Sequence, residues 1–166
     1  ALGSYLTPEF SNRAAHAVAS GWRISGVFNG ASGQWLNVTT GQDNSGNGLN
    51  NQRPNKVSDD VYGAKTIAAF LNKAAFAQPA PGTFGNLEIN SIKGPARWTV
   101  DGTLSKTIRL ANTQTIELRL ESINVLNHPN WGNPAVNLNL GTFGRITTLQ
   151  TGATPRIFQF GLKYGF

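Results

Sequence analysis

The last eleven residues of the chain alternate between apolar side chains and polar or small ones. Phe158, Phe160, Leu162, Tyr164 and Phe166 lie two residues apart, and glutamine, lysine or glycine separates them. Because successive side chains of a β-strand point to opposite faces, this spacing predicts a strand with one fully apolar face. Its length fits the roughly 9–11 residues with which a tilted strand crosses a bilayer. The spacing alone also fits a half-buried strand of a soluble sheet.

Two earlier segments alternate in the same way and predict an antiparallel hairpin. Residues 97–110 carry apolar side chains at every second position, with Lys106 as the one interruption. Residues 115–126 follow after a predicted tight turn at 111–114, and their alternation slips at Ile123. The opposite face is hydrophilic, so it suits either bulk water or the lumen of a large barrel. The residues that would face lipid in a membrane barrel are Trp98, Val100, Leu104, Ile108, Phe158, Phe160 and Leu162.

The N-terminal part predicts a short helix followed by a strand. The alanine-rich stretch Ser11–Ala19 can form one or two helical turns, with Ser11 or Asn12 as the cap. Residues 21–40 alternate as a strand, and Gly30 and Gly33 indicate a bend within it. A strand of twenty residues is about twice the length that a membrane crossing requires, so part of it should project or turn back.

Residues 41–96 and 127–155 show no sustained period. Irregular stretches of more than ~15 residues are unusual in compact soluble domains, whereas outer-membrane barrels carry long loops on one side. In the first stretch, helical spacing of four apolar residues predicts a short loop helix; they are Ile67, Phe70, Leu71 and Ala74. In the second, residues 144–149 are expected to form a small projecting strand.

No group of residues has the spacing of a catalytic or metal site. Asp43 begins a stretch, DNSGNG, that mimics the front half of a calcium-binding loop, but Pro54 replaces the required bidentate acid at its twelfth position. We therefore assign its asparagines and glycines to turn formation. His16 and His128 have no His, Cys or carboxylate nearby at ligand spacing, and the chain has no cysteine. We expect no catalytic residue, no metal, no cofactor and no enzyme activity.

The charge pattern argues against nucleic-acid binding. The net charge is +6, from 14 basic and 8 acidic residues, but the basic residues are scattered rather than arranged in a stripe. Charged residues make up 13% of the chain, well below the roughly 25% of ordinary soluble domains. The chain begins with Ala1 and shows no signal-peptide pattern, which we interpret as a processed start or a fragment edge.

Several stretches carry a family resemblance that covers residues 8–166. They are FNGASGQWLNVTTGQDNSG, NQRPN, LNKAAFAQPAPGTFGN, ESINVLNHPNWGNP, TFGRITT and PRIFQFGLKYGF. They resemble the C-terminal portion of TonB-dependent receptors, most closely the large Oar-like receptors of acidobacterial type. The chain's end also resembles the C-terminal signal read by the bacterial barrel-assembly machinery, with Gln159, Gly161, Tyr164 and Phe166 in the matching positions.

The resemblance implies an all-β fold, in which antiparallel strands form the C-terminal part of a transmembrane β-barrel with long extracellular loops and a short loop helix. Residues 1–166 would supply about five of 22 strands, and the plug and the remaining barrel would lie outside this chain. Such a receptor sits in the cell outer membrane and imports a bulky nutrient ligand. The implied partners are outer-membrane lipid, the barrel-assembly machinery, TonB through the missing N-terminal part, and an unidentified ligand. The C-terminal end would face the periplasm.

Two other functions stay open at this point. One is an outer-membrane adhesion or surface-binding barrel without transport. The other is a soluble β-sandwich that binds carbohydrate, because an amphipathic strand by itself suits either environment.

Overall fold

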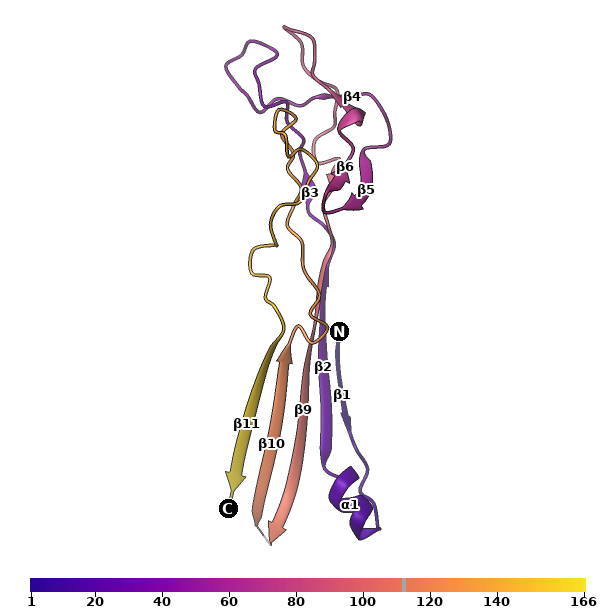
Figure 1. The fold of residues 1–166 in the computed structure, drawn as a ribbon, viewed down its shortest axis with the longest axis vertical. Coiled ribbons are helices and arrows are strands. Elements are labelled where there is room, and N and C mark those ends of the chain that lie inside the picture. Colours follow the sequence, from indigo (N-terminus) through magenta and orange to yellow (C-terminus); the bar gives the residue numbers. More distant parts are fainter. Residues whose placement is uncertain (112) are drawn as a thin grey trace. The chain divides into compact units, whose positions relative to one another are not determined.

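The computed structural model describes residues 1–111 and 113–166, which form two compact units (Figure 1). We call the first the strand unit; it comprises Ala1–Ala31, Trp98–Pro129 and Gly152–Phe166. We call the second the loop unit; it comprises Ser32–Arg97 and Asn130–Thr151. Each unit is described by itself below.

The strand unit contains a five-stranded sheet with the order β1-β2-β9-β10-β11. Its strands are β1 (Leu2–Leu6), β2 (Trp22–Ala31), β9 (Arg97–Ala111), β10 (Gln114–Ile123) and β11 (Ile157–Gly165). β1 pairs antiparallel with β2, and β10 pairs antiparallel with both β9 and β11. The predicted antiparallel β fold is thus confirmed. The sheet is not closed in the described part of the chain, where β1 and β11 each have a neighbour on one side only.

The predicted N-terminal helix is confirmed as α1 (Arg13–Ala19), between β1 and β2. The Asn12 side chain caps it and accepts hydrogen bonds from the backbone N–H groups of Ala14 (2.9 Å) and Ala15 (3.2 Å). The first N–H groups of a helix have no acceptor within the helix, so an N-cap oxygen that accepts from them stabilises the first turn. Among the described residues, no helix is long and apolar enough to span a membrane.

The loop unit has a hydrophobic core of its own, around which three two-stranded ribbons are arranged. The ribbons are β3 (Trp35–Leu36) with β8 (Ile92–Lys93), β4 (Asn55–Lys56) with β7 (Phe76–Ala77), and β5 (Tyr62–Thr66) with β6 (Ala69–Leu71). The buried core residues are Val38, Phe70, Leu71, Ala75, Phe76, Leu87, Ile92, Leu138, Phe143 and Ile146. Both irregular segments of the sequence contribute to this core, so each needs the other to bury its apolar side chains.

The predicted loop helix over Ile67–Ala74 is wrong. This stretch forms the end of the β5–β6 hairpin and then a single 3₁₀ turn, η1 (Lys73–Ala75). Phe70 and Leu71 are both buried, and their N–H groups donate to the carbonyl oxygen of Gly144 (2.8 and 3.1 Å). A short apolar run satisfies helix and strand spacing alike, and here contacts with a distant segment decide the outcome.

The strand predicted over residues 144–149 is also wrong. This segment makes isolated contacts instead: the Ile146 N–H donates to the carbonyl of Ile67 (2.8 Å), and Leu149 forms a single bridge with Trp131. The strand predicted over 21–40 is shorter than expected, because β2 ends at Ala31 and only Trp35–Leu36 continues as strand. The predicted turn at 111–114 includes residue 112, which lies outside the described residues.

The bend predicted within residues 21–40 is explained by a close backbone contact at Gly33. A Cβ at Gly33 would lie 1.8 Å from the carbonyl oxygen of Gly94, so a larger residue could not approach the backbone there. The strand predicted over residues 115–126 is also shorter than expected, because β10 ends at Ile123, the residue at which the alternation slips.

The segment that follows β10 is organised by the side chain of Asn124. Asn124 is 1% exposed and has a φ of +50°, a conformation that asparagine tolerates better than most residues. Its Nδ2 donates to the carbonyl oxygens of His128 (3.0 Å) and Thr154 (2.9 Å), and its Oδ1 accepts from the His128 N–H (3.0 Å). Its own N–H donates to Oδ1 of Asp101 in β9 (2.8 Å). One residue thereby joins β9, the end of β10 and the chain that leads into β11.

Replacing Asn124 with alanine should therefore destabilise the strand unit. Asn124→Ala removes three side-chain hydrogen bonds and leaves their backbone partners unpaired, which we expect to lower the free energy of unfolding by about 2–4 kcal/mol. Asn127→Ala is the matched control, because Asn127 has a similar φ of +51° but is exposed and accepts one hydrogen bond, from the Arg156 N–H. Urea titration of the full protein folded in lipid vesicles measures both, and equal losses would contradict the role given to Asn124.

Candidate functional site

The register of the sheet places apolar side chains on one face, which we call the apolar face. Leu120 of β10 lies between Leu104 of β9 and Phe160 of β11. The ring of Phe28 in β2 stacks on Trp98 in β9 with centroids 6.3 Å apart, which extends the face to β2. Its members are Tyr5, Trp22, Ile24, Phe28, Trp98, Val100, Leu104, Lys106, Ile108, Ile116, Leu118, Leu120, Phe158, Phe160, Leu162 and Tyr164.

All seven residues that the sequence selects as lipid-facing lie on the apolar face. Many of its side chains are open to the surroundings: Phe160 is 84% exposed and Leu162 is 74% exposed. Soluble monomers rarely expose large contiguous apolar surfaces, so a surface of this kind marks an interaction with a partner or a membrane.

Aromatic residues occur toward both ends of the strands on this face. β2 starts with Trp22 and has Phe28 near its other end, while β11 has Phe158 at its start and Tyr164 at its end. Ile24 lies between them in β2, and Phe160 and Leu162 lie between them in β11. Aromatic rings near both ends of apolar strands are typical of strands that cross a bilayer.

The opposite face of the sheet, the polar face, carries charged and hydroxyl side chains. Glu117 of β10 lies between Thr107 of β9 and Lys163 of β11. Arg119 and Glu121 of β10 form an ion pair with 3.3 Å between Nε and Oε1. Both of these side chains are about half exposed, so the pair contributes little to stability, and its position shows a face suited to water.

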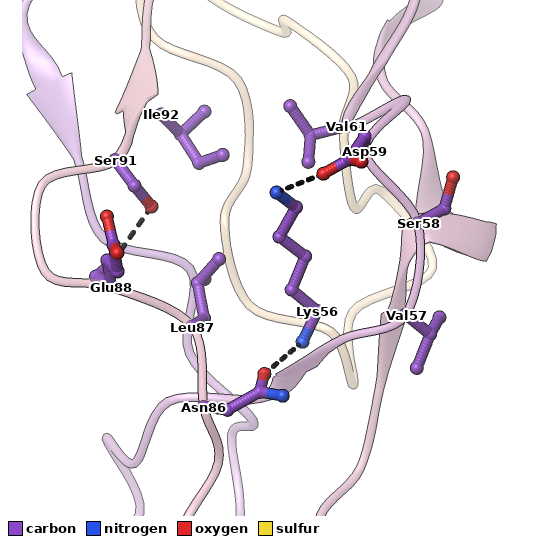
Figure 2. Close-up of a pocket in the computed structure, with 10 residues that line it drawn as sticks. All are labelled: Lys56, Val57, Ser58, Asp59, Val61, Asn86, Leu87, Glu88, Ser91 and Ile92. Atoms are coloured by element: carbon purple, nitrogen blue, oxygen red, sulfur yellow. Dashed lines mark hydrogen bonds and ion pairs between the residues drawn. The ribbon is translucent and has the colours of Figure 1, made fainter.

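The loop unit contains a cavity of about 490 Å³ with a polar rim and an apolar floor (Figure 2). Leu87 and Ile92 are almost fully buried at this cavity. At its rim, Nζ of Lys56 lies 2.6 Å from Oδ1 of Asp59, and this hydrogen-bonded ammonium lowers the pKa of the Asp59 carboxyl below its ordinary value. Such a mixture of groups suits a ligand that is partly polar and partly apolar.

A smaller cavity of about 250 Å³ in the same unit is lined mainly by polar groups. The Arg97 guanidinium shares it with the side chains of Gln34 and Asn133, and Asn133 Nδ2 donates to Gln34 Oε1 (2.8 Å). Thr148 and Gln150 add a hydroxyl and a third amide. Guanidinium and amide groups together can bind hydroxyl or carboxylate groups of a ligand. Sequence reasoning missed both cavities, because their residues come from segments far apart in the chain.

The assignment of the Asp43 stretch to turn formation is confirmed. The Asp43 carboxylate accepts hydrogen bonds from the N–H groups of Gly48 (2.6 Å), Gly46 (2.8 Å) and Asn47 (3.1 Å). These bonds, that of Gly48 foremost, lower the pKa of the Asp43 carboxyl below its ordinary value. Gly46 and Gly48 have φ values of +76° and +84°, which favour glycine.

A residue that the sequence did not single out, Gln52, completes this loop. It is 7% exposed, and its Nε2 donates to Oδ1 of Asp43 (2.5 Å), Oγ of Ser45 (2.8 Å) and Oδ1 of Asn47 (3.0 Å). Oxygens that would surround calcium in a calcium-binding loop therefore bind an amide nitrogen here. These hydrogen bonds, together with those that Asp43 accepts, hold the shape of the loop.

The two histidines lie in unrelated places. His16 is exposed on α1, and the ring of His128 stacks on Trp98 with 3.8 Å between centroids. Within the described residues, no three His, Cys, Asp or Glu side chains are grouped as metal ligands would be.

The four residues of the C-terminal signal lie on or just after β11. Gln159 and Gly161 are paired with Glu121 and Arg119 of β10 and share the polar face, while Tyr164 belongs to the apolar face. Phe166 follows the strand and is 94% exposed, with its ring 6.2 Å from that of Tyr164.

Comparison with known proteins identifies a family that matches this chain. A family model described as "Outer membrane beta barrel domain" matches residues 3–159, which is most of the chain. Proteins of this family are typically non-enzymatic. No curated protein and no solved structure matches the chain.

Proposed function

The chain belongs to the outer membrane beta barrel domain family and lies in the cell outer membrane, and from this premise we propose that it is the C-terminal part of a TonB-dependent receptor that imports a bulky nutrient ligand. The observation that carries the proposal is the register of the five-stranded sheet, which separates an exposed apolar face from a polar face. An outer-membrane location is incompatible with the soluble β-sandwich alternative.

In this proposal the apolar face contacts lipid and the polar face lines the lumen. Hydrocarbon cannot satisfy backbone or side-chain hydrogen bonds, so a spanning strand presents apolar groups to lipid and polar groups inward. The alternation in β9, β10 and β11 meets this requirement.

The remaining barrel must supply strands to both edges of the sheet. In the described part of the chain, β1 and β11 each pair on one side only. An unpaired strand edge in hydrocarbon would leave a row of N–H and C=O groups unsatisfied. We propose that other strands of the same receptor, 22 in all, pair with β1 and β11 and close the barrel around a plug.

The loop unit would then contact the ligand outside the cell. The two cavities described above offer a guanidinium, an ammonium, carboxylates, amides and hydroxyls from an already folded surface. TonB would act through the N-terminal part that lies outside this chain, and the C-terminal end would face the periplasm. There Gln159, Gly161, Tyr164 and Phe166 would serve as the signal for the barrel-assembly machinery.

The receptor proposal is tested on the native polypeptide that ends in KYGF. Detergent-extracted outer membrane should yield a polypeptide several times larger than this chain, and immobilised periplasmic TonB domain should retain it. A large polypeptide that TonB does not retain would favour an adhesion barrel without transport.

The lipid-facing role is tested by charges at two adjacent positions of β11. Phe160→Arg should destabilise the protein in vesicles by about 2–4 kcal/mol, because arginine in the middle of the lipid face is strongly unfavourable. Gln159→Arg is the matched control on the polar face, where we expect a change within about 0.5 kcal/mol. Both positions are exposed, so equal effects in urea titrations would argue against lipid contact.

The assembly signal is tested at the last residue. Phe166→Ala should reduce the amount of folded protein in the outer membrane severalfold, because the aromatic end is what the assembly machinery would read. Phe84→Ala is the matched control, since Phe84 is an exposed phenylalanine of the loop unit (69% exposed). Heat-modifiable mobility on gels of membrane fractions measures the folded amount. Equal recovery of the two variants would contradict the proposed signal.

A further inference from the structure

The apolar face contains one charged residue, Lys106. It is paired with Leu118 of β10, which in turn is paired with Leu162 of β11, so the lysine lies among aliphatic side chains. Lys106 is only 7% exposed. An ionised group on the lipid side of a barrel wall is unfavourable unless other groups satisfy it, so its contacts are informative.

The ammonium of Lys106 binds the C-terminal end of α1. Nζ donates to the carbonyl oxygens of Ala17 (3.1 Å), Val18 (3.3 Å) and Ser20, and it lies 5.2 Å from the centroid of the Trp22 ring. The last carbonyls of a helix have no partner within it and form the negative end of its dipole. Three donor hydrogens thus meet three acceptors, and α1 is held against the apolar face.

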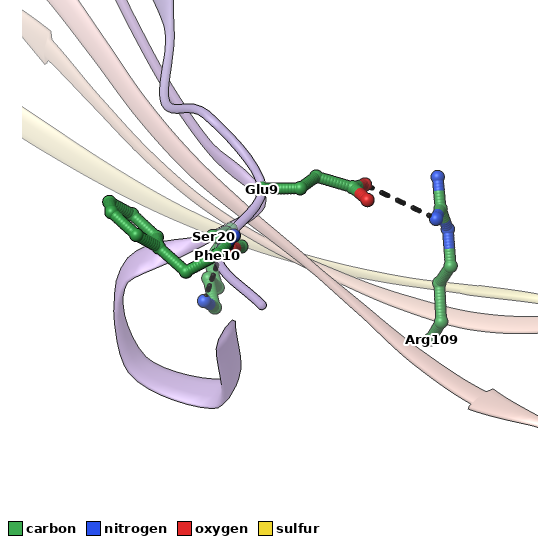
Figure 3. Close-up of polar contacts among 5 residues, drawn as sticks. Glu9, Phe10, Ser20 and Arg109 are labelled. Atoms are coloured by element: carbon green, nitrogen blue, oxygen red, sulfur yellow. Dashed lines mark hydrogen bonds and ion pairs between the residues drawn. The ribbon is translucent and has the colours of Figure 1, made fainter. Parts of the chain in front are cut away.

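The connection that carries α1 also contacts the polar face (Figure 3). Glu9, which precedes the helix, forms an ion pair with Arg109 (3.4 Å between Oε1 and Nη1), and Arg109 is paired with Thr115 on the polar face. The N–H of Phe10 donates to Oγ of Ser20 (3.0 Å), which ties the two ends of the helix segment together. The connection therefore crosses the end of the sheet, and the helix itself lies on the apolar side.

We infer that α1 and the groove beside it form a phospholipid-binding surface at this end of the barrel wall. The groove has a volume of about 460 Å³ and is lined mainly by Trp22, Leu104, Leu118, Leu120, Phe160 and Leu162. Next to it, α1 presents Val18, which is 74% exposed, and Phe10 precedes the helix at 42% exposed. An acyl chain lies in the groove, and α1 lies at the depth of the headgroups.

Phospholipid is the occupant because the groove is continuous with the face that contacts lipid. This step rests on the proposed function, in which the apolar face is the outer surface of the wall. A helix on that surface cannot be in the lumen, and it meets the bilayer at the end of the strands. Exposed apolar side chains on a short helix, with tryptophan beside it, are typical of segments that lie in the membrane interface.

Site-specific fluorescent labels test this inference in the full outer-membrane protein. This chain has no cysteine, and any cysteine elsewhere in the full protein is first replaced with serine. Val18→Cys, Phe160→Cys and Asn50→Cys then introduce labels on α1, on the wall and on the loop unit. The protein is reconstituted in phosphatidylethanolamine–phosphatidylglycerol vesicles with brominated acyl chains. We expect these lipids to quench the labels at positions 18 and 160, and aqueous iodide to quench the label at position 50.

The label at position 160 distinguishes failure of the inference about α1 from failure of the proposed lipid-facing wall. Lipid quenching at 160 together with iodide quenching at 18 would overturn the inference and leave the wall intact, as for a helix that projects into water. Iodide quenching at both positions would overturn the lipid-facing wall itself. Shielding of position 18 from both quenchers would overturn the inference in favour of a protein partner.

The role of Lys106 is tested in the same preparation. Lys106→Met keeps the stem of the side chain and removes the donor, so iodide quenching of the label at position 18 should rise to that of the label at position 50. Lys163→Met is the matched control on the polar face, and it should leave the label unchanged. Position 18 staying lipid-quenched in Lys106→Met would overturn the claim that this lysine holds α1.

Discussion

The pairing of β10 with its two neighbours is the constraint on which the strand unit depends. Leu120 lies between Leu104 and Phe160, and Glu117 lies between Thr107 and Lys163. Because side chains alternate with a period of two, a slip of one residue would move every apolar residue of β10 to the polar face. The apolar and polar faces therefore exist only in this register, and the wall function proposed for the sheet depends on it.

The loop unit shows that long irregular segments can be folded without long strands. Residues from both segments, among them Phe70, Leu87 and Phe143, share one core, and short ribbons and single bridges supply the backbone hydrogen bonds. A ligand-contacting surface with its own core loses less conformational entropy on binding than a mobile loop would, because most of its side chains are already ordered. This favours a role in recognition for the two cavities.

The sequence predicted those parts of the fold that depend on local periodicity. The long strands, the helix with Ser11 or Asn12 as its cap and the slip in alternation at Ile123 follow from spacing and capping that adjacent residues determine. The helix over Ile67–Ala74 failed because its apolar residues are held by Gly144, which is far away in the chain. The cavities were missed for the same reason, because they depend on contacts between distant segments. The role of Gln52 was missed although its partners lie nearby in the chain, because periodicity does not record the hydrogen bonds of a polar side chain within a turn.

Lys106 shows how an exception to a pattern can carry information that the pattern lacks. The position of this lysine in the alternating pattern is not explained by β9 itself, because strand spacing places the side chain among leucines. The explanation lies in α1, whose terminal carbonyls need a donor, just as the lysine needs acceptors. The ammonium of Lys106 needs acceptors on an apolar face, and the carbonyl oxygens at the end of the short helix need donors. The hydrogen bonds between them meet both needs. That complementarity makes the attachment of α1 to the apolar face a property of the fold, and in the proposed barrel wall it would place a helix at the lipid surface.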